Sequence, residues 1–250
     1  MLRSRIIPCL LVRELGLVKT RQFADAKYVG DPLNAVKIFN EKEVDELMLL
    51  DIDATAQRRV PNFEFLRSLA VESRMPLCYG GGITSAQQAA QIIALGFEKI
   101  SVSAAAVLRP ALIKEIADAV GSQSVVVTVD VRRKKLFDGY NVYTRNGKDF
   151  QKVNFLEFCR QAVELGAGEV VINSIDRDGE MQGYDLELAK KVRDAVASPI
   201  SILGGAGSMN DLQALIDAVG VVGAAAGSLF VFKGIYRAVL INYARPPRLN

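Results

Sequence analysis

The sequence contains no histidine and no tryptophan among its 250 residues. The absence of histidine excludes Ser-His and Cys-His nucleophile pairs and every metal site that depends on imidazole. Proton transfer, if the protein is an enzyme, must use Asp, Glu, Lys, Tyr or Cys. We expect neither a metal nor a cofactor.

Cysteine, long apolar runs and excess charge are also scarce. Cys9, Cys78 and Cys159 form no C-x-x-C pair, and an odd number does not fit a disulfide framework, so we expect a reducing, cytoplasmic location. No apolar run approaches the roughly 18 residues of a membrane span, and the start MLRSRIIPCLLV lacks a cleavage site and predicts a strand. The net charge of +3 is small and scattered, so neither a membrane nor nucleic acid is an expected partner.

Short apolar runs alternate with amphipathic stretches along the whole chain. Continuous apolar character is typical of parallel strands buried on both faces. The expected strands are 6–10, 46–51, 77–79, 99–102, 125–130, 170–173, 200–203 and 221–225, and helical patterns include 31–40, 86–95, 110–120, 155–165 and 186–196. Eight strand–helix units predict a single (βα)8 TIM barrel over residues 1–250, with a doubly wound sheet as the rival.

Two features refine this architecture. Residues 135–144 surround Asp138-Gly139 and predict a small hairpin after the fifth strand. At a shift of 123 residues, Glu46 aligns with Glu169, Asp53 with Asp176, Pro76 with Pro199, and Gly81-Gly82 with Gly204-Gly205. This agreement predicts a twofold repeat of half-barrels.

Two glycine clusters follow the third and seventh expected strands, at the barrel end that carries active sites. Backbone N–H groups of glycine-rich turns and helix starts bind phosphate. The residues expected to form two phosphate sites, one per half, are Gly81, Gly82, Ser103, Gly204, Gly205, Gly227 and Ser228. The alternative is that the glycines only permit tight turns.

Carboxylates at strand ends are the candidates for acid–base chemistry. They are Asp51, Asp53, Asp130, Asp176 and Asp178. Asp130 is favoured because it closes the apolar run VVVTVD, and burial there would raise its pKa. For any one of the others, a helix cap or a salt bridge is the alternative role.

Four charges of alternating sign lie at the opposite ends of the strands. Arg5, Glu46, Lys99 and Glu169 each begin a strand, so they could form a ring that closes the bottom of the barrel. On spacing alone, a stabilising salt-bridge layer is the favoured role of these charges.

These residues together resemble a known family, the cyclase subunit of imidazole glycerol phosphate synthase. The strings that carry the resemblance are RIIPCLLV, Lys19, Gly30-Asp31-Pro32, DELMLLDIDAT, KISVSAAAV, VVVTVDVRR, NSIDRDGEMQGYDLEL, LGGAGS and AAAGSLF. SIDRDG followed by GYDLEL is similar to the cyclase and not to its sister isomerase barrel.

The resemblance implies a lyase-type subunit of a glutamine amidotransferase complex. A separate HisH-like glutaminase subunit would form a heterodimer at the barrel bottom and release ammonia. The ammonia would pass the charged ring and reach a phosphorylated small molecule at the top, where Asp130, Lys19 and Asp178 are the implied catalytic residues. Lys19 is expected on a loop after the first strand, with residues 23–30 mobile in it.

The departures from the family concern the top face. The family carries a second catalytic aspartate where this chain has Leu11, and leucine cannot transfer a proton. It also usually has Asn-Thr at Ser103-Ala104, serine at Leu203 and threonine at Asn173.

Three interpretations follow. The first is a paralogue that supplies ammonia, with an ATP-dependent amidating enzyme, for converting an acetamido to an acetamidino sugar in lipopolysaccharide (O-antigen) biosynthesis. The second is a true cyclase of histidine biosynthesis that makes imidazole glycerol phosphate and AICAR. The third is a non-catalytic scaffold that binds phosphate.

Overall fold

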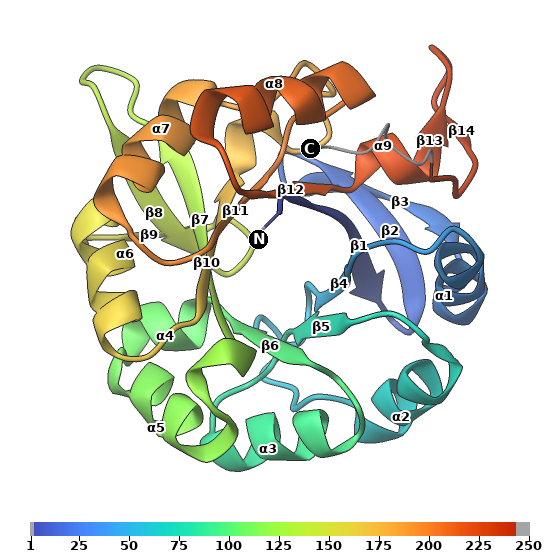
Figure 1. The fold of residues 1–250 in the computed structure, drawn as a ribbon, viewed down its shortest axis with the longest axis horizontal. Helices are drawn as coiled ribbons and strands as arrows, with labels where there is room; N and C mark the ends of the chain where they lie inside the picture. The colour runs from blue at the N-terminus through green and yellow to red at the C-terminus, as the bar shows by residue number, and fades with distance from the viewer. Residues whose placement is uncertain (1–2, 244–250) are drawn as a thin grey trace.

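Eight parallel strands close into a barrel in the computed structural model, which describes residues 3–243 (Figure 1). Residues 1–2 and 244–250 of the expected domain lie outside the described part. The barrel strands are β1 (Arg5–Arg13), β4 (Leu47–Asp51), β5 (Leu77–Gly80), β6 (Lys99–Val102), β7 (Val125–Arg133), β10 (Glu169–Ser174), β11 (Ile200–Leu203) and β12 (Gly223–Ala226). β12 pairs in parallel with β1 and closes the barrel, so the expected (βα)8 fold is confirmed and the open sheet is excluded.

Helices surround the barrel and connect its strands. They are α1 (Pro32–Glu41), α2 (Phe63–Glu72), α3 (Ala86–Ala94), α4 (Ala104–Leu108), α5 (Ala111–Val120), α6 (Phe155–Glu164), α7 (Leu186–Ala195), α8 (Met209–Val219) and α9 (Ser228–Val231), with 3₁₀ turns η1 (Ser122–Ser124) and η2 (Ile175–Arg177). Local sequence explains where they begin. The Asp31 side chain accepts from the backbone N–H of Asn34, and Pro32 occupies the first helical position, where its missing donor costs nothing.

The first strand of each half extends beyond the barrel and carries an antiparallel hairpin. β1 pairs with β2 (Gly16–Arg21), which pairs with β3 (Ala24–Gly30). In the second half β7 pairs with β8 (Tyr140–Thr144) and β8 with β9 (Asp149–Gln151). The hairpin expected around Asp138-Gly139 is confirmed, and its repetition supports the duplicated architecture.

One expectation about this region was wrong. Lys19 does not lie on a loop but on strand β2, and most of residues 23–30 form strand β3. A second, small sheet of β13 (Phe232–Lys233) and β14 (Ala238–Val239) follows α9 and was not predicted.

Alternation along the strands arranges the barrel interior in layers. Side chains two residues apart face the same side of a strand. On β1 this period places Arg5 at the bottom of the barrel, Ile7 and Cys9 above it, and Leu11 at the mouth, with Ile7 and Cys9 inside an apolar cluster. The cluster comprises Ile7, Cys9, Met48, Cys78, Val126, Val171, Leu203 and Ala225. It therefore lies between the charged bottom and the mouth.

All three cysteines are buried and unpaired by disulfides. Within residues 3–243, no helix has the length and apolar character needed to cross a bilayer.

Candidate functional site

Two cavities open at the carboxyl ends of the strands. The larger cavity has a volume of about 130 Å³ and the smaller cavity about 30 Å³. Residues that contribute polar atoms or glycine backbone to the larger cavity include Asp51, Gly81, Gly82, Ser103, Asp130, Arg145, Asn146 and Asn173. The smaller cavity is lined by Lys19, Asp178, Gly204, Gly205, Gly227 and Ser228, among others. The structure thus groups the two predicted glycine clusters into separate cavities, one for each half.

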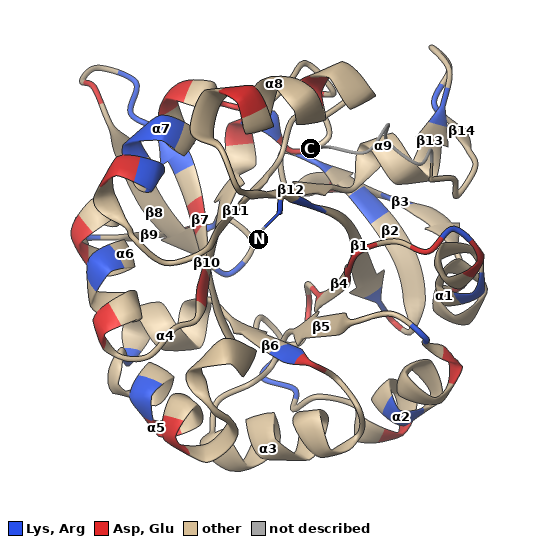
Figure 2. Ribbon diagram, viewed as in Figure 1, with Lys and Arg blue, Asp and Glu red and all other residues tan. Residues whose placement is uncertain are grey.

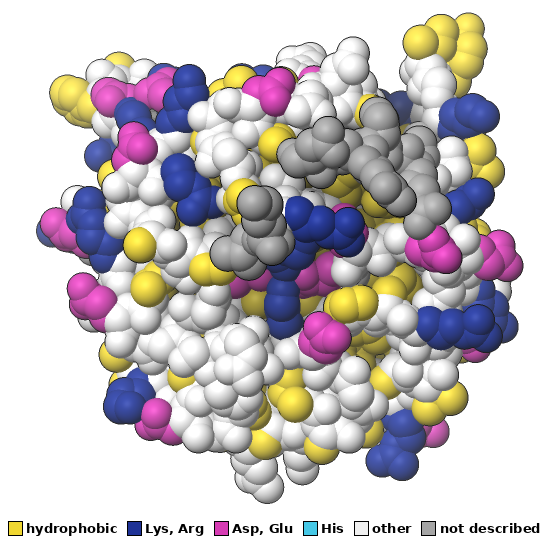
Figure 3. All heavy atoms as spheres, in the orientation of Figure 1, with side chains coloured by type: hydrophobic (Ala, Val, Ile, Leu, Met, Phe, Trp, Pro, Cys, Tyr) yellow, Lys and Arg dark blue, Asp and Glu magenta, His cyan; other side chains and the backbone are white. Residues whose placement is uncertain are grey.

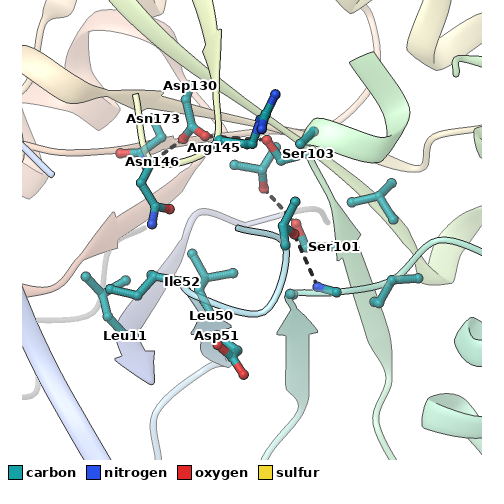
Figure 4. Close-up of a pocket in the computed structure, with 18 of the residues that line it drawn as sticks. Leu11, Leu50, Asp51, Ile52, Ser101, Ser103, Asp130, Arg145, Asn146 and Asn173 are labelled. Atoms are coloured by element: carbon teal, nitrogen blue, oxygen red, sulfur yellow. Dashed lines mark hydrogen bonds between the residues drawn. The ribbon is translucent and has the colours of Figure 1, made fainter. Parts of the chain in front are cut away.

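Asp130 lies in the wall of the larger cavity (Figure 4). Its Oδ1 accepts a hydrogen bond of 2.9 Å from the Asn173 amide, and its Oδ2 one of 3.4 Å from the Ser103 hydroxyl. Burial raises the pKa of Asp130 from 3.8 to about 7, although both hydrogen bonds lower it; the nearby Asp178 raises it further. The expected direction is therefore confirmed, and a carboxyl with this pKa can accept or donate a proton near neutrality.

The glycines are required by the backbone itself. Gly81 has φ +129°, and a Cβ there would lie 2.6 Å from the Asp51 carbonyl oxygen. Gly205 has φ +115°, and a Cβ would lie 2.1 Å from the Gly183 carbonyl oxygen. Both turns therefore exclude a side chain whether or not a ligand binds, so anion binding must be supported by other observations.

One such observation is an unsatisfied hydroxyl in the smaller cavity. Ser228 is 4% exposed, and its Oγ has no hydrogen-bond partner among the described residues. A buried hydroxyl without a protein partner is costly, and this hydroxyl lies in the wall of the smaller cavity, where a ligand could accept its hydrogen bond. The Lys19 side chain runs close by, with its Cε 3.0 Å from where a Cβ on Gly227 would be.

Lys19 and Asp178 form a buried ion pair beside the smaller cavity. The Lys19 ammonium donates to Asp178 and to the Thr20 carbonyl. Asp178 also accepts from the Thr20 hydroxyl at 2.6 Å and from the Phe23 backbone N–H at 3.1 Å. The sequence identified Lys19 and Asp178 but not Thr20. Thr20 lies on β2, which was expected to be part of a loop, and only the folded hairpin brings its hydroxyl to Asp178.

The other strand-end aspartates have structural partners. Asp51 accepts from the backbone N–H groups of Asp53 and Ala54, while Asp53 forms an ion pair with Arg13 at 2.8 Å. Asp176 accepts from the backbone N–H of Arg133. Of these three carboxylates, only Asp51 lines the larger cavity.

The four bottom charges form a closed ring of ion pairs. Arg5 contacts Glu46, and lies 2.7 Å from Glu169, while Lys99 lies 2.7 Å from Glu46 and 2.9 Å from Glu169. In Figure 2 charges mark the starts of β6 and β10, and in Figure 3 basic and acidic side chains gather at the centre of this face. The predicted assembly of these four residues is therefore confirmed.

The ring is held in its charged state by mutual contact. Burial alone would raise the pKa of Glu169, but Arg5 and Lys99 hold it below its usual range. Burial likewise opposes charge on Arg5 and Lys99, yet the two glutamates raise the pKa of each. The Ser201 hydroxyl, from the barrel interior, also donates to Glu169.

Sequence reasoning missed several residues of the mouth. Phe23 lines both cavities from the turn between β2 and β3, and Arg145 and Asn146 line the larger one from the turn between β8 and β9. The second turn had a signal, since Asn146-Gly147 is a strong hairpin pair. No comparable signal marks Gln22-Phe23, whose residues adopt positive φ without glycine or asparagine.

The fold and site define a (βα)8 barrel with paired cavities at its mouth, a half-buried carboxyl of raised pKa between β7 and β10, and a closed ring of charges at its base. The chain belongs to the family described as "Histidine biosynthesis protein", which matches residues 5–236.

Relatives with curated names cover the chain almost completely. It is 53% identical to the "Putative imidazole glycerol phosphate synthase subunit hisF3" of Vibrio vulnificus, over 98% of this chain and 95% of that protein. It is 50% identical to the "Putative imidazole glycerol phosphate synthase subunit hisF2" of Pseudomonas aeruginosa, over 100% of this chain and 99% of that protein. It is 37% identical to the "Imidazole glycerol phosphate synthase subunit HisF" of Clostridium botulinum (strain Okra), over 98% of this chain and 97% of that protein. The chain is therefore a HisF-type barrel.

Proposed function

We propose that this barrel receives ammonia from a glutaminase subunit docked at its bottom and delivers it to a phosphorylated small molecule at its mouth. The acceptor chemistry is sugar amidation, in which an acetamido group becomes an acetamidino group with the help of an ATP-dependent amidating enzyme. The observation that carries this proposal is the combination of an intact charged ring at the base with Leu11 at the mouth.

The ring supports a gate at the bottom of the barrel. Two cations and two carboxylates, with Glu46 and Glu169 only 3% and 4% exposed, close the lower opening. Above it lies the apolar cluster, which excludes charged ammonium and favours neutral ammonia. A passage of this kind needs a source of ammonia below, and a glutaminase supplies it.

The cavities support an anionic acceptor at the top. The unsatisfied Ser228 hydroxyl, the nearby Lys19 and the backbone of Gly204, Gly205 and Gly227 surround the smaller cavity. Gly81, Gly82 and Ser103 provide comparable groups in the larger one. Backbone N–H groups, hydroxyls and a lysine are the donors that proteins use for phosphate.

Leu11 favours the amidating branch over the cyclase. It lines both cavities, so the position where the family has its second catalytic aspartate is at the centre of the mouth and apolar. Asp130 remains, but the pair of carboxylates needed for cyclisation is incomplete. The alternative, a cyclase of histidine biosynthesis, is favoured by the name of the Clostridium botulinum relative.

A coupling assay tests the gate. The barrel, its glutaminase, the amidating enzyme, ATP and an acetamido nucleotide sugar are mixed with glutamine, and product and glutamate are both measured. We expect Lys99→Ala to lower the ratio of product to glutamate, because ammonia escapes where the ring is open.

Arg3→Ala is the matched control for this assay. Arg3 pairs with Asp45 at 2.9 Å on the same face but outside the ring, and its side chain is 75% exposed. The ratio should stay at the wild-type value for Arg3→Ala. An unchanged ratio for Lys99→Ala would contradict the gate.

A further inference from the structure

Asn173 occupies the junction of the two cavities and lies directly beside Asp130. The two residues are register partners in the pairing of β10 with β7, and Asn173 is 6% exposed. Three residues line both cavities, namely Leu11, Phe23 and Asn173. Asn173 is the polar one of the three, so it is the shared residue that can make hydrogen bonds to a ligand spanning both cavities.

The contact between Asn173 and Asp130 is the stronger of the two that hold this carboxyl. The Asn173 amide donates at 2.9 Å, close to the ideal distance, whereas the Ser103 hydroxyl is 3.4 Å away. Rotation of a carboxyl about its terminal bond is otherwise soft. The plane of the Asp130 carboxyl is therefore set mainly by Asn173, which directs Oδ2 to the side of Ser103 in the larger cavity (Figure 4).

Leu11 belongs to the same inward-facing layer but supplies no polar atom. The period of two along each strand places Leu11 on β1, Ser103 after β6, Asp130 on β7 and Asn173 on β10 at the mouth. The polar groups of this layer thus lie on the β6–β7–β10 side. Figure 4 shows Leu11 across the cavity from them.

We propose that Asn173 is the positioning residue of this site, because its amide fixes the orientation of the Asp130 carboxyl. Asn173 also presents a polar group at the junction of the two cavities, where Leu11 presents none. The role rests on the proposed function only in that Asp130 is taken as the reacting carboxyl. An amide does not titrate, so it stabilises the carboxylate without adding a second acid or base.

Titration of Asp130 in the isolated chain tests this role directly. The carboxyl carbon is followed by NMR in protein labelled with ¹³C-aspartate and assigned with Asp130→Asn. In Asn173→Leu the midpoint should rise by about one pH unit, because one hydrogen bond to the charged form is lost. Asn173→Thr, which keeps a shorter donor, should give a smaller rise.

The matched control is Ser103→Ala, which removes the longer hydrogen bond and should shift the midpoint less than Asn173→Leu. Charged groups that line the cavities and face this region are Asp178, Lys19, Asp51, Arg13 and Arg145. These groups are the same in all variants, so a difference in the Asp130 midpoint between variants reports the hydrogen bond that was removed. Methyl NMR spectra confirm that each variant is folded.

An unchanged midpoint in both Asn173 variants, or a larger rise in Ser103→Ala, would overturn the proposal. The measurement uses neither glutaminase nor substrate. A failure of ammonia delivery would therefore leave its outcome unaffected, and the two claims are tested separately.

Discussion

At and above neutral pH, Asp130 makes the folded protein less stable than a neutral residue would at its position. Its pKa is raised by burial from 3.8 to about 7, so between these values the folded state holds a proton that the unfolded state has lost. The contribution of Asp130 to the free energy of unfolding is fully present below about pH 4. It is lost as the pH rises to about 7, where the carboxyl of the folded state ionises. A carboxyl with this pKa exchanges protons near neutrality, and we propose that this property is the reason to retain it.

The variant Asp130→Asn should therefore be more stable than the wild type at pH 8, by a few kcal/mol at most. At pH 4 the difference should be small, because the carboxyl is neutral in the folded state and only about half ionised in the unfolded state. Urea unfolding at the two pH values measures this. Asp118→Asn, at an exposed position on α5 whose carboxylate pairs with Lys114, is the control and should show no such pH-dependent gain. Equal stability of Asp130→Asn and wild type at pH 8 would contradict the account.

The sequence alone predicted the charged residues of the site better than their neutral partners. Asp130 and the four ring residues stand out because charge at the end of an apolar strand is unusual. Thr20 does not stand out, and Asn173 stands out only as a departure from the family, since the role of each depends on which strand lies beside it. Register between β7 and β10, or between β2 and β3, has no signature within either segment.

At the scale of elements, one residue beyond the β1–β2 ladder binds the end of β2 and the turn that leads into β3. Asp178, after η2, binds the Lys19 ammonium, the Thr20 hydroxyl and the Phe23 N–H, and its carbonyl accepts from Gln22. All four contacts involve the end of β2 or the turn that follows. The equivalent β8–β9 hairpin does not use Asp178, so it provides an internal comparison.

Asp178→Ala should loosen this hairpin selectively. The substitution leaves the buried Lys19 ammonium without its carboxylate, which costs about 3 kcal/mol in comparable cases. Hydrogen exchange should accelerate at residues 20–24, with the largest change at the Phe23 amide, while residues 140–151 keep their wild-type rates. Uniform acceleration of both hairpins would instead indicate general destabilisation.

The contrast between the hairpins shows what limits prediction of elements. Asp138-Gly139 identifies β8 in the sequence. The turns at Glu14-Leu15 and Gln22-Phe23 adopt positive φ with residues that rarely do so, and no local pattern announces them. Tertiary contacts such as those of Asp178 stabilise the second of these turns, so β2 and β3 were mistaken for a loop.

At the scale of the whole molecule, duplication explains the placement of both ends of the site. Glu46 and Glu169 occupy equivalent positions in the two halves, and so do the glycine clusters of the two cavities. Arg5 and Lys99 both come from the first half, yet each contacts a glutamate from each half. The ring therefore exists only in the closed barrel.

The barrel itself was predictable because its eight strands are mostly buried on both faces and every connection between them is long enough for a helix. The observed ends of strands differ from the predicted ones by a few residues, as at β7, which continues beyond Asp130 into its hairpin. The substrate could not be predicted, because it depends on the shape of cavities assembled from many short loops.

The central claim is that the barrel retains the ammonia gate but lacks the cyclase step. Its most direct test supplies the isolated chain with the formimino-ribonucleotide substrate of the cyclase and an ammonium salt, which makes the glutaminase unnecessary. Formation of imidazole glycerol phosphate and AICAR is measured for the wild type and for Leu11→Asp.

We predict negligible turnover by the wild type and a gain of roughly 10²–10⁴ in Leu11→Asp, the contribution typical of one general acid or base. Wild-type turnover at the rate of a HisF cyclase, with no gain from Leu11→Asp, would contradict the account and identify the protein as a cyclase of histidine biosynthesis.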